Sequence, residues 1–296
     1  MIRPLPALLV EAFASAPLQG NGAAVVLLET PAAASWMQAL AASLQQSETA
    51  FLHHGADGSW RLRWFTPRCE VPLCGHATLA ATVALQHWGH LQAGESLRLA
   101  TRSGGLAVSL LPQQPQQPVA SLVLPSGPLQ PLPVPTELTA LLHTPPLAYW
   151  GSALGYRVAL LPESFPLQAL PCISAQLQGP DRGGLVLMQG LADTSLSLLG
   201  GPCDYQLRFF APDLGIEEDP VTGSAHALVA PWWMQQLCRN QVRGWQPSHR
   251  HGGMLCEAAE PGFVRLTGFG HLLWDGQINA PGCGSDPDGW VVCSSA

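Results

Sequence analysis

The feature that most constrains this chain is a Pro-x-x-Gly motif that occurs twice, half a chain apart. The first copy is Pro72–His76 (PLCGH), and the second is Pro220–Ser224 (PVTGS). Their glycines lie 148 positions apart in a chain of 296 residues. A repeat at half the chain length predicts two similar domains, in each of which a strand ends in a glycine turn that opens a helix.

A glycine turn at a helix N-terminus leaves backbone N–H groups without partners in the helix. These groups, together with the helix dipole, favour the binding of an anion. We therefore expect the turns at Gly75 and Gly223 to hold a small acidic molecule between the two domains.

Composition excludes several classes of function. Hydrophobic residues make up 47% of the chain and charged residues 11%, which is typical of a folded protein and not of a disordered one. The net charge of −7 argues against nucleic acid as a partner. No apolar run approaches the length of a membrane span, so no membrane partner is expected.

All 13 basic residues are arginine. Without lysine, the chain has no residue for Schiff-base chemistry or for a Walker-type phosphate loop.

The N-terminus weakly resembles a signal peptide, but Pro6 and Glu11 interrupt the apolar run, so a strand over Leu8–Phe13 is favoured. The eight cysteines show no paired spacing. We expect reduced thiols and a cytoplasmic location.

Alternating apolar residues predict short strands in both halves, and helical spacing predicts helices over Trp36–Ser43, Thr78–Trp88 and His226–Cys238. The second of these is apolar on nearly every side and is expected to be buried. The strands expected are Leu8–Phe13, Ala23–Leu28, Thr49–Leu52, Trp60–Phe65, Ser96–Ala100, Leu106–Leu110, Arg157–Leu161, Gly184–Met188, Tyr205–Phe210, Phe263–Thr267 and His271–Trp274.

The proline-rich segments Leu111–Pro118 and Pro125–Pro135 mark a linker region. We expect a first domain over residues 1–118 and a second over residues 119–296, whose last strands are candidates to return to the first domain. The pattern predicts an α+β fold of two domains with pseudo-twofold symmetry, each a curled, mostly antiparallel sheet around a central helix. The end of the chain, Pro281–Ala296, is expected to be a loose tail apart from Trp290–Val292.

Two residues of the first half are candidates for proton transfer. Glu48 lies between a predicted helix and a predicted strand, where it is either a solvated loop carboxylate or a general base. His76 follows Gly75 at the helix start, where an imidazole either transfers a proton, holds a substrate hydroxyl, or only caps and packs.

The second turn offers counterparts. Ser224 occupies the position of His76 and suits either an N-cap or a substrate hydrogen bond. Asp219, just before Pro220, either fixes the turn or directs a carboxylate at the substrate.

Other chemistries receive less support. Cys74 is close to His76, but the repeat places Thr222 where a second thiol would lie, so a nucleophilic cysteine is disfavoured. His53-His54 and His249-x-His251 lack further ligands at metal spacing, so no metal site is expected. Gly20-Asn21-Gly22 lacks the remaining glycine of a dinucleotide fingerprint.

Several motifs, in order, resemble the phenazine-biosynthesis isomerase (PhzF-like) family over about residues 8–278. The chain departs from the family at Gly22, where proline is usual, at His251, and after about residue 279. The matching segments are Glu11–Phe13, Gly20–Val26, Ser47–Phe51, Arg63–Pro67, Glu70–Thr78, Arg208–Pro212 and Glu218–His226, with a weaker match over Ser248–Arg250 and Gly252–Gly253.

The resemblance implies a diaminopimelate-epimerase-like fold with its active site between two domains, and a homodimer as a candidate assembly. It also implies a cofactor-free proton shift on a small carboxylic acid. By this resemblance Glu48 is the catalytic acid and base, and the substrate is bound by His76 with the Gly75 turn, and by Asp219, Gly223 and Ser224.

Three hypotheses follow. The first is an isomerase that transfers a proton between carbons of a small, cyclic carboxylic or amino acid. The second is a thiol-type racemase or epimerase, which needs a cysteine in each half. The third is a ligand-binding protein that retains the fold without catalysis.

Overall fold

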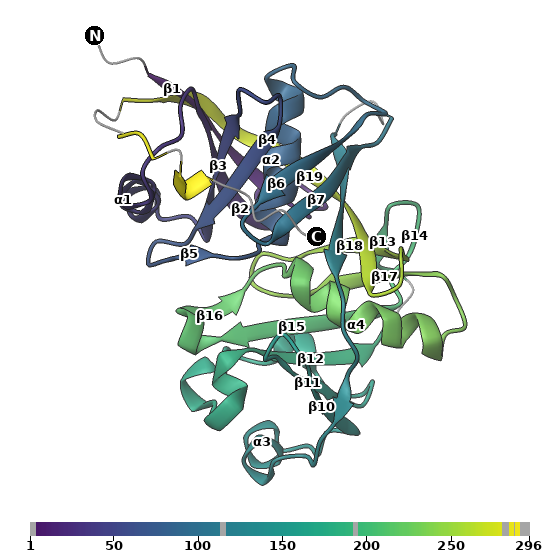
Figure 1. The fold of residues 1–296 in the computed structure, drawn as a ribbon. Coiled ribbons are helices and arrows are strands. Elements are labelled where there is room, and N and C mark those ends of the chain that lie inside the picture. The colour runs from purple at the N-terminus through teal and green to yellow at the C-terminus, as the bar shows by residue number, and fades with distance from the viewer. Residues whose placement is uncertain (1–3, 113–116, 192–194, 280–283, 287, 291–296) are drawn as a thin grey trace. The chain divides into compact units, whose positions relative to one another are not determined.

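Figure 1 shows the computed structural model of the chain, which describes all residues except 1–3, 113–116, 192–194, 280–283, 287 and 291–296. The chain forms two compact units. The first comprises Met1–Val123 and Thr267–Ala296, and the second is the continuous segment Leu124–Leu266. The division after Val123 falls between the two proline-rich segments.

In the first unit, strands and helices occur largely where apolar periodicity predicted them. Its elements are β1 (Leu5–Ala12), β2 (Asn21–Leu28), α1 (Ala34–Leu44), β3 (Glu48–His54), β4 (Trp60–Phe65), β5 (Glu70–Val71), α2 (Gly75–His87), β6 (Ser96–Thr101) and β7 (Gly104–Leu110). Strands β8 (Val119–Pro125) and β19 (Phe263–Ile278) contain the two points at which the chain passes between the units.

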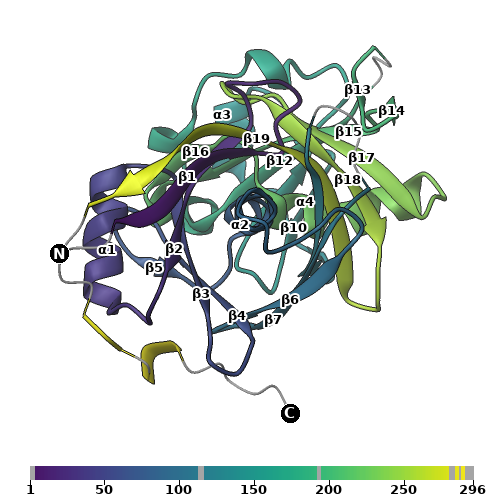
Figure 2. The same cartoon turned by 90° about the horizontal axis from the view of Figure 1, so that it is seen from above.

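The strands of the first unit curl around α2, which Figure 2 shows end-on. Strand β1 pairs antiparallel with β2 and β19, β2 parallel with β3, β3 antiparallel with β4, and β4 parallel with β6. The ladder continues antiparallel through β7 to β8, which pairs with β19 and so closes the sheet. A closed sheet has an interior that only a helix of suitable surface can fill.

Helix α2 has that surface. Every residue from Gly75 to Leu85 is buried. The two hydroxyls within this stretch donate to carbonyls four residues back, Thr78 to Cys74 at 2.6 Å and Thr82 to Thr78 at 2.9 Å. These two hydroxyls are thus satisfied inside the helix, so their burial leaves neither of them unpaired.

The second unit has its own helices and strands. They are β9 (Gln130–Pro131), α3 (Thr136–Leu142), β10 (Ala148–Gly151), β11 (Arg157–Leu160), β12 (Leu185–Gly190), β13 (Ser197–Leu198), β14 (Gly201–Pro202), β15 (Tyr205–Ala211), β16 (Ile216–Asp219), α4 (Gly223–Gln236), β17 (Gln241–Gln246) and β18 (Gly252–Ala258). Short 3-10 helices are η1 (Leu167–Ala169), η2 (Ser174–Gln176), η3 (Gly179–Gly183), η4 (Pro212–Leu214) and, in the first unit, η5 (Asp288–Trp290).

The second unit repeats the ladder of the first. Strand β10 pairs antiparallel with β11, β11 parallel with β12, β12 antiparallel with β15, β15 parallel with β17, and β17 antiparallel with β18. This is the same sequence of pairings as β1, β2, β3, β4, β6 and β7, and α4 occupies the place in chain order that α2 has in the first unit. The predicted α+β fold of two similar units is confirmed.

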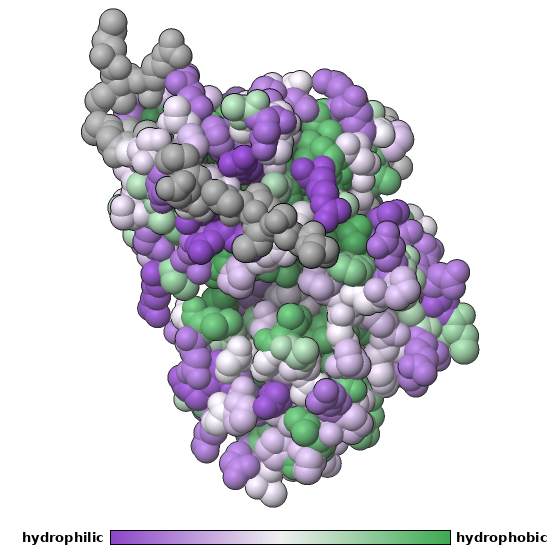
Figure 3. Space-filling model, viewed as in Figure 1, coloured by the Kyte–Doolittle hydropathy of each residue, from purple (hydrophilic) through white to green (hydrophobic). Residues whose placement is uncertain are grey.

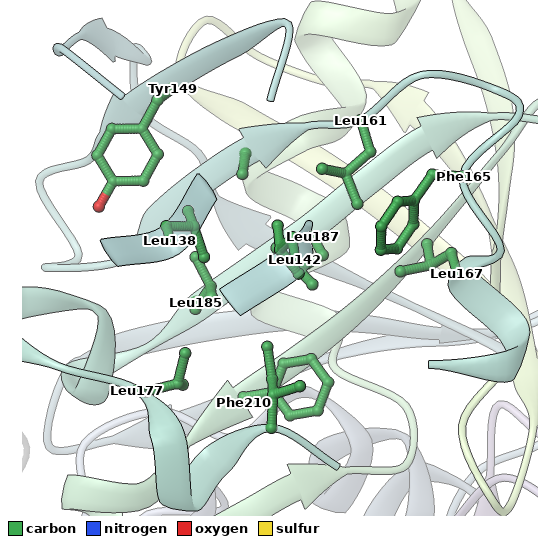
Figure 4. Close-up of a cluster of buried hydrophobic side chains, with 12 residues drawn as sticks. Leu138, Leu142, Tyr149, Leu161, Phe165, Leu167, Leu177, Leu185, Leu187 and Phe210 are labelled. Atoms are coloured by element: carbon green, nitrogen blue, oxygen red, sulfur yellow. The ribbon is translucent and has the colours of Figure 1, made fainter. Parts of the chain in front are cut away.

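A cluster of leucine and phenylalanine side chains forms one core of the second unit (Figure 4). Helix α3 contributes Leu138 and Leu142, which lie among side chains from β11, β12 and β15. Tyr149 belongs to the same cluster, but its hydroxyl points away from the leucines and donates to the Asp181 carboxylate.

Some elements differ from the prediction. The expected strands Phe263–Thr267 and His271–Trp274 are one strand, β19, because Gly268 and Gly270 remain extended and pack against Phe13 and Val83. A side chain at either position would collide with these neighbours, so the glycines permit close packing and do not end the strand.

On the face shown in Figure 3, hydrophobic residues form patches among hydrophilic ones. Within the described parts of the chain, no helix is long and apolar enough to cross a membrane, and α4 has only 14 residues.

The prediction excepted Trp290–Val292 from the loose tail, and the structure confirms this for Trp290. Trp290 is 3% exposed and packs in a core of the first unit that includes Met37 and Phe51. Its indole N–H donates to the Ala32 carbonyl at 2.9 Å, and Arg61 donates to its carbonyl. Trp290 therefore anchors the segment, while Val291 and Val292, expected to be ordered with it, lie outside the described residues.

Replacing Trp290 by alanine should lower the free energy of unfolding by about 3–5 kcal/mol, because it empties a buried aromatic site. Trp274, which is 44% exposed, provides the matched control: Trp274→Ala should cost about 0.5 kcal/mol. Urea unfolding followed by circular dichroism measures both. Equal losses in the free energy of unfolding for the two variants would show that Trp290 is not a core residue.

Candidate functional site

Both glycine turns leave helix N–H groups available. The residue before α2 is Cys74 and the residue before α4 is Thr222; both have extended backbones, and neither side chain caps its helix. An N-cap serine or threonine usually accepts a bond from the first turn of the helix. Here the first N–H groups of α2 and α4 are free of such a cap, which suits them to bind a carboxylate.

A bidentate arginine–glutamate pair precedes each turn. In the first unit Arg63 donates to Glu70 from two nitrogens, each at 2.8 Å. In the second unit Arg208 donates to Glu218 at 2.7 and 2.6 Å. Both glutamates lie five residues before the turn glycine, so each pair fixes the strand that leads into its turn.

The first turn brings Glu48 and His76 together. Glu48 is the first residue of β3 and His76 the second of α2, and they are 6% and 4% exposed. Glu48 Oε2 lies 2.9 Å from His76 Nε2. The parallel pairing of β2 with β3, in which Ala23 faces Glu48, places the carboxylate at this end of the sheet.

The other nitrogen of His76 faces two further side chains. Asn21, the fully buried first residue of β2, has its amide nitrogen 3.2 Å from His76 Nδ1. The sulfur of Cys74 lies 3.6 Å from the same atom. Both ring nitrogens of His76 are thus engaged, which fixes the orientation of the imidazole.

His76 favours its charged form. Burial acts to lower its pKa, but the neighbouring Cys74 sulfur and the Glu48 carboxylate outweigh burial and hold the pKa well above its usual value. The site therefore places a buried carboxyl group 2.9 Å from an imidazole whose pKa is raised, and both groups are of the kind that exchange protons.

Cys74 is an unreactive thiol. Burial, followed by the Glu48 charge, raises its pKa to about 11, although His76 acts in the opposite direction. Its counterpart Thr222 donates to the Asp219 carboxylate at 2.6 Å. The two-thiol mechanism weighed above gains no support from either residue.

The second turn is a closed set of hydrogen bonds. The Thr222 N–H donates to the Gln246 side chain at 2.9 Å, and the Gln246 amide donates to the Asp219 carbonyl at 2.5 Å. Ser224, one residue into α4, is half-buried, and its hydroxyl lies 3.3 Å from that of Tyr156. The start of α4 is therefore polar and partly accessible to solvent.

The residues predicted from the sequence fall into two groups. Glu48, Gly75 and His76 lie together in the first unit, and Asp219, Gly223 and Ser224 lie together at the second turn. Their roles in binding or catalysis remain predictions.

Three residues that contact the predicted site residues were not singled out from the sequence: Asn21, Tyr156 and Gln246. Asn21 could have been suspected, because a polar asparagine at the start of an apolar strand needs a hydrogen-bond partner once it is buried. Nothing in the local sequence pointed to Tyr156 or Gln246, because they reach the second turn from distant parts of the sequence.

Glu48, Cys74 and His76 also carry donor atoms of the types that bind metals. One donor atom from each lies within 4.8 Å of the others. Glu48 and His76 are in direct contact at 2.9 Å, so a metal would have to displace that contact and also the Cys74 proton, which burial favours.

His53 is buried on β3 and contacts the Leu28 carbonyl, so it belongs to the core.

Comparison with known proteins identifies relatives along most of the chain. Residues 10–132 and 186–275 match the family model described as phenazine biosynthesis-like protein. An uncharacterized isomerase of Pseudomonas aeruginosa is 37% identical over 277 residues, which cover 91% of this chain and 96% of that protein. The mouse phenazine biosynthesis-like domain-containing protein 1 is 31% identical, with 93% and 99% covered.

Solved structures also match this chain over most of its length. A PhzF family protein of Enterococcus faecalis matches with a TM-score of 0.80 and 30% identity, covering 93% of this chain and 99% of that one. A hydroxyproline epimerase of Agrobacterium vitis, solved with bound trans-4-hydroxy-L-proline, matches with a TM-score of 0.61 at 12% identity, a likeness of fold alone. These matches confirm the epimerase-like α+β fold, and the relatives' names support an isomerase- or epimerase-type function for the family.

The state of Cys74 can be tested with iodoacetamide at pH 7.5. We expect the exposed Cys69, Cys172 and Cys238 to be labelled first, because a rise from 9 to about 11 in pKa lowers the thiolate fraction of Cys74 about 100-fold. Cys203, also buried and with its pKa raised to about 11, is the matched control. Peptide mass spectrometry measures the rates; labelling of Cys74 as fast as Cys69 would contradict an inert thiol.

The ion pair predicts how His76 titrates. Its stabilising effect is complete below the usual histidine pKa and is lost as the pH rises through the raised value. In Glu48→Gln the carboxylate is gone, so the pKa of His76 should fall. NMR titration of the imidazole measures this, and His53, whose pKa is lowered chiefly by burial, should titrate equally in both proteins. An unchanged pKa of His76 in Glu48→Gln would mean that Glu48 does not stabilise the imidazolium.

Proposed function

Because this chain belongs to the phenazine biosynthesis-like protein family, we propose that it is an isomerase that moves a proton between two carbons of a small, cyclic carboxylic or amino acid. The observation that carries the proposal is the buried contact of Glu48 with His76 at 2.9 Å, next to the start of α2. It places a proton acceptor and a proton donor at the same helix N-terminus.

In this mechanism the Glu48 carboxylate takes a proton from a C–H bond of the substrate. The electron pair left on that carbon is delocalised into the adjoining unsaturated system. A proton then returns to a different carbon, from Glu48 or from the His76 imidazolium. The substrate gains and loses one proton, so the reaction is balanced without an oxidant or reductant.

The helix N-termini stabilise the charge that develops. Additional negative charge develops on the substrate while the proton is on the protein, and uncapped N–H groups at Gly75 and His76 favour that added charge. Burial of Glu48 and His76 strengthens these interactions, because little water screens them.

The proposal also covers the second turn, because the same motif is repeated there. Asp219, Gly223 and Ser224 lie at the corresponding turn of the second unit, and we infer that they bind polar groups of an acidic substrate. Asp219 accepts from Thr222, which leaves its carboxylate oriented by the turn and 7% exposed. No metal or organic cofactor has a role in this scheme.

Glu48→Gln should lower proton exchange about 10²–10⁴-fold, the contribution of one positioned acid–base group, while substrate binding is largely kept. The assay is deuterium uptake in D₂O by NMR, with a panel of small cyclic and hydroxylated amino and carboxylic acids. Glu95→Gln, at an exposed carboxylate of the same unit, is the control.

Near-wild-type exchange in Glu48→Gln would refute the assignment of the base. Binding without exchange in the wild-type protein would favour the ligand-binding alternative over an isomerase.

A further inference from the structure

We propose that Gln246 is a positioning residue, which holds the turn Asp219–Thr222 in the shape that presents the N-terminus of α4 to the substrate. The inference rests on the proposed function, since it assigns a role to a residue outside the repeated motif. Gln246 is the last residue of β17 and is completely buried.

One side chain joins both ends of the turn. The Gln246 amide oxygen accepts the Thr222 N–H at 2.9 Å, and its amide nitrogen donates to the Asp219 carbonyl at 2.5 Å. The same nitrogen lies 3.4 Å from the Thr222 hydroxyl, which itself donates to the Asp219 carboxylate. Fixing these two residues fixes the direction of the Asp219 carboxylate and the point at which α4 begins.

This arrangement requires a side chain that both donates and accepts. One contact needs an acceptor and the other a donor, and at neutral pH the glutamine amide offers both. The Ser248 hydroxyl also faces the Asp219 carbonyl, at 3.5 Å, but it makes no contact with Thr222 among the described hydrogen bonds. Gln246 is therefore the link between the two ends.

The strand that carries Gln246 is itself rigid. Strand β17 pairs parallel with β15 and antiparallel with β18, with Gln246 opposite Gly252. Gly244, two residues earlier, approaches His226 of α4 so closely that an added Cβ would lie 2.3 Å from the imidazole. The helix and its preceding turn are thus both located against one strand.

The test compares three variants. Gln246→Leu removes both hydrogen bonds, whereas Gln246→Glu keeps the shape but places an acceptor against the Asp219 carbonyl. Gln189→Glu is the matched control: Gln189 is also buried in the second unit and donates to a backbone carbonyl, that of Glu163, but does not contact the turn.

We expect both Gln246 variants to raise KM for the exchanging acid about tenfold and to change kcat less than about threefold, because the turn binds substrate while Glu48 remains. The titratable groups that face position 246 are the buried His226 of α4, which hydrogen-bonds the Gln246 side chain, and the Asp219 carboxyl group, which accepts from Thr222. Gln246→Glu should recover its affinity as the pH falls, since a protonated carboxyl again donates to the Asp219 carbonyl and accepts from the Thr222 N–H. Gln189→Glu should leave KM unchanged at every pH at which it is folded.

A second readout does not depend on activity. Hydrogen exchange of the Thr222 amide should be about tenfold faster in Gln246→Leu than in the wild type, and unchanged in Gln189→Glu. Faster amide exchange without any catalysed reaction would count against the proposed function but leave the positioning role intact. Equal KM values and equal Thr222 protection in the Gln246 variants and the control would overturn the role itself.

Discussion

The structure depends on one constraint, the burial of helix α2 on every side from Gly75 to Leu85. A helix that is apolar all round needs a sheet that surrounds it, and the closed ladder from β1 to β8 and β19 supplies that enclosure. The enclosure fixes the helix axis, and with it the position of the first N–H groups of the helix.

The arginine–glutamate pairs fix the strands that lead into the two glycine turns. Each guanidinium also lies over the phenylalanine two residues later, 5.4 Å from the Phe65 ring and 5.1 Å from the Phe210 ring. Burial alone would raise the pKa of Glu70, but Arg63 and Arg102 together lower it, so the carboxylate stays charged. In the more deeply buried second pair, loss of Glu218 would leave the Arg208 guanidinium, which is 5% exposed, without its partner, and an uncompensated buried charge typically costs about 3–5 kcal/mol. The two motifs thus share this ion pair as well as the glycine turn.

Much of this architecture could be predicted from the sequence, because its signals are local. The spacing of apolar residues predicted the helix Thr78–Trp88, and the repeated motif predicted the two glycine turns. Helices α2 and α4 confirm both predictions. The contact of Glu48 with His76 was not predicted, although both residues were singled out, since it results from the pairing of β2 with β3. Gln246 reaches Thr222 across 24 residues, and Trp290 reaches Ala32 across 258. Such contacts follow from the fold and leave no pattern in the nearby sequence.

The path of the chain also sets the order in which the protein can be made. Strand β1 pairs along its whole length with β19, from Leu5 opposite Ile278 to Ala12 opposite Gly270. The first unit is therefore completed only by residues that follow the whole second unit in the chain, whereas the second is one continuous segment. Domains usually fold in order from the N-terminus during synthesis, but here the second unit has all its strands before the first has β19. The half that carries Glu48 is thus begun first and completed last, and a chain cut short before β19 leaves one edge of β1 without its partner strand.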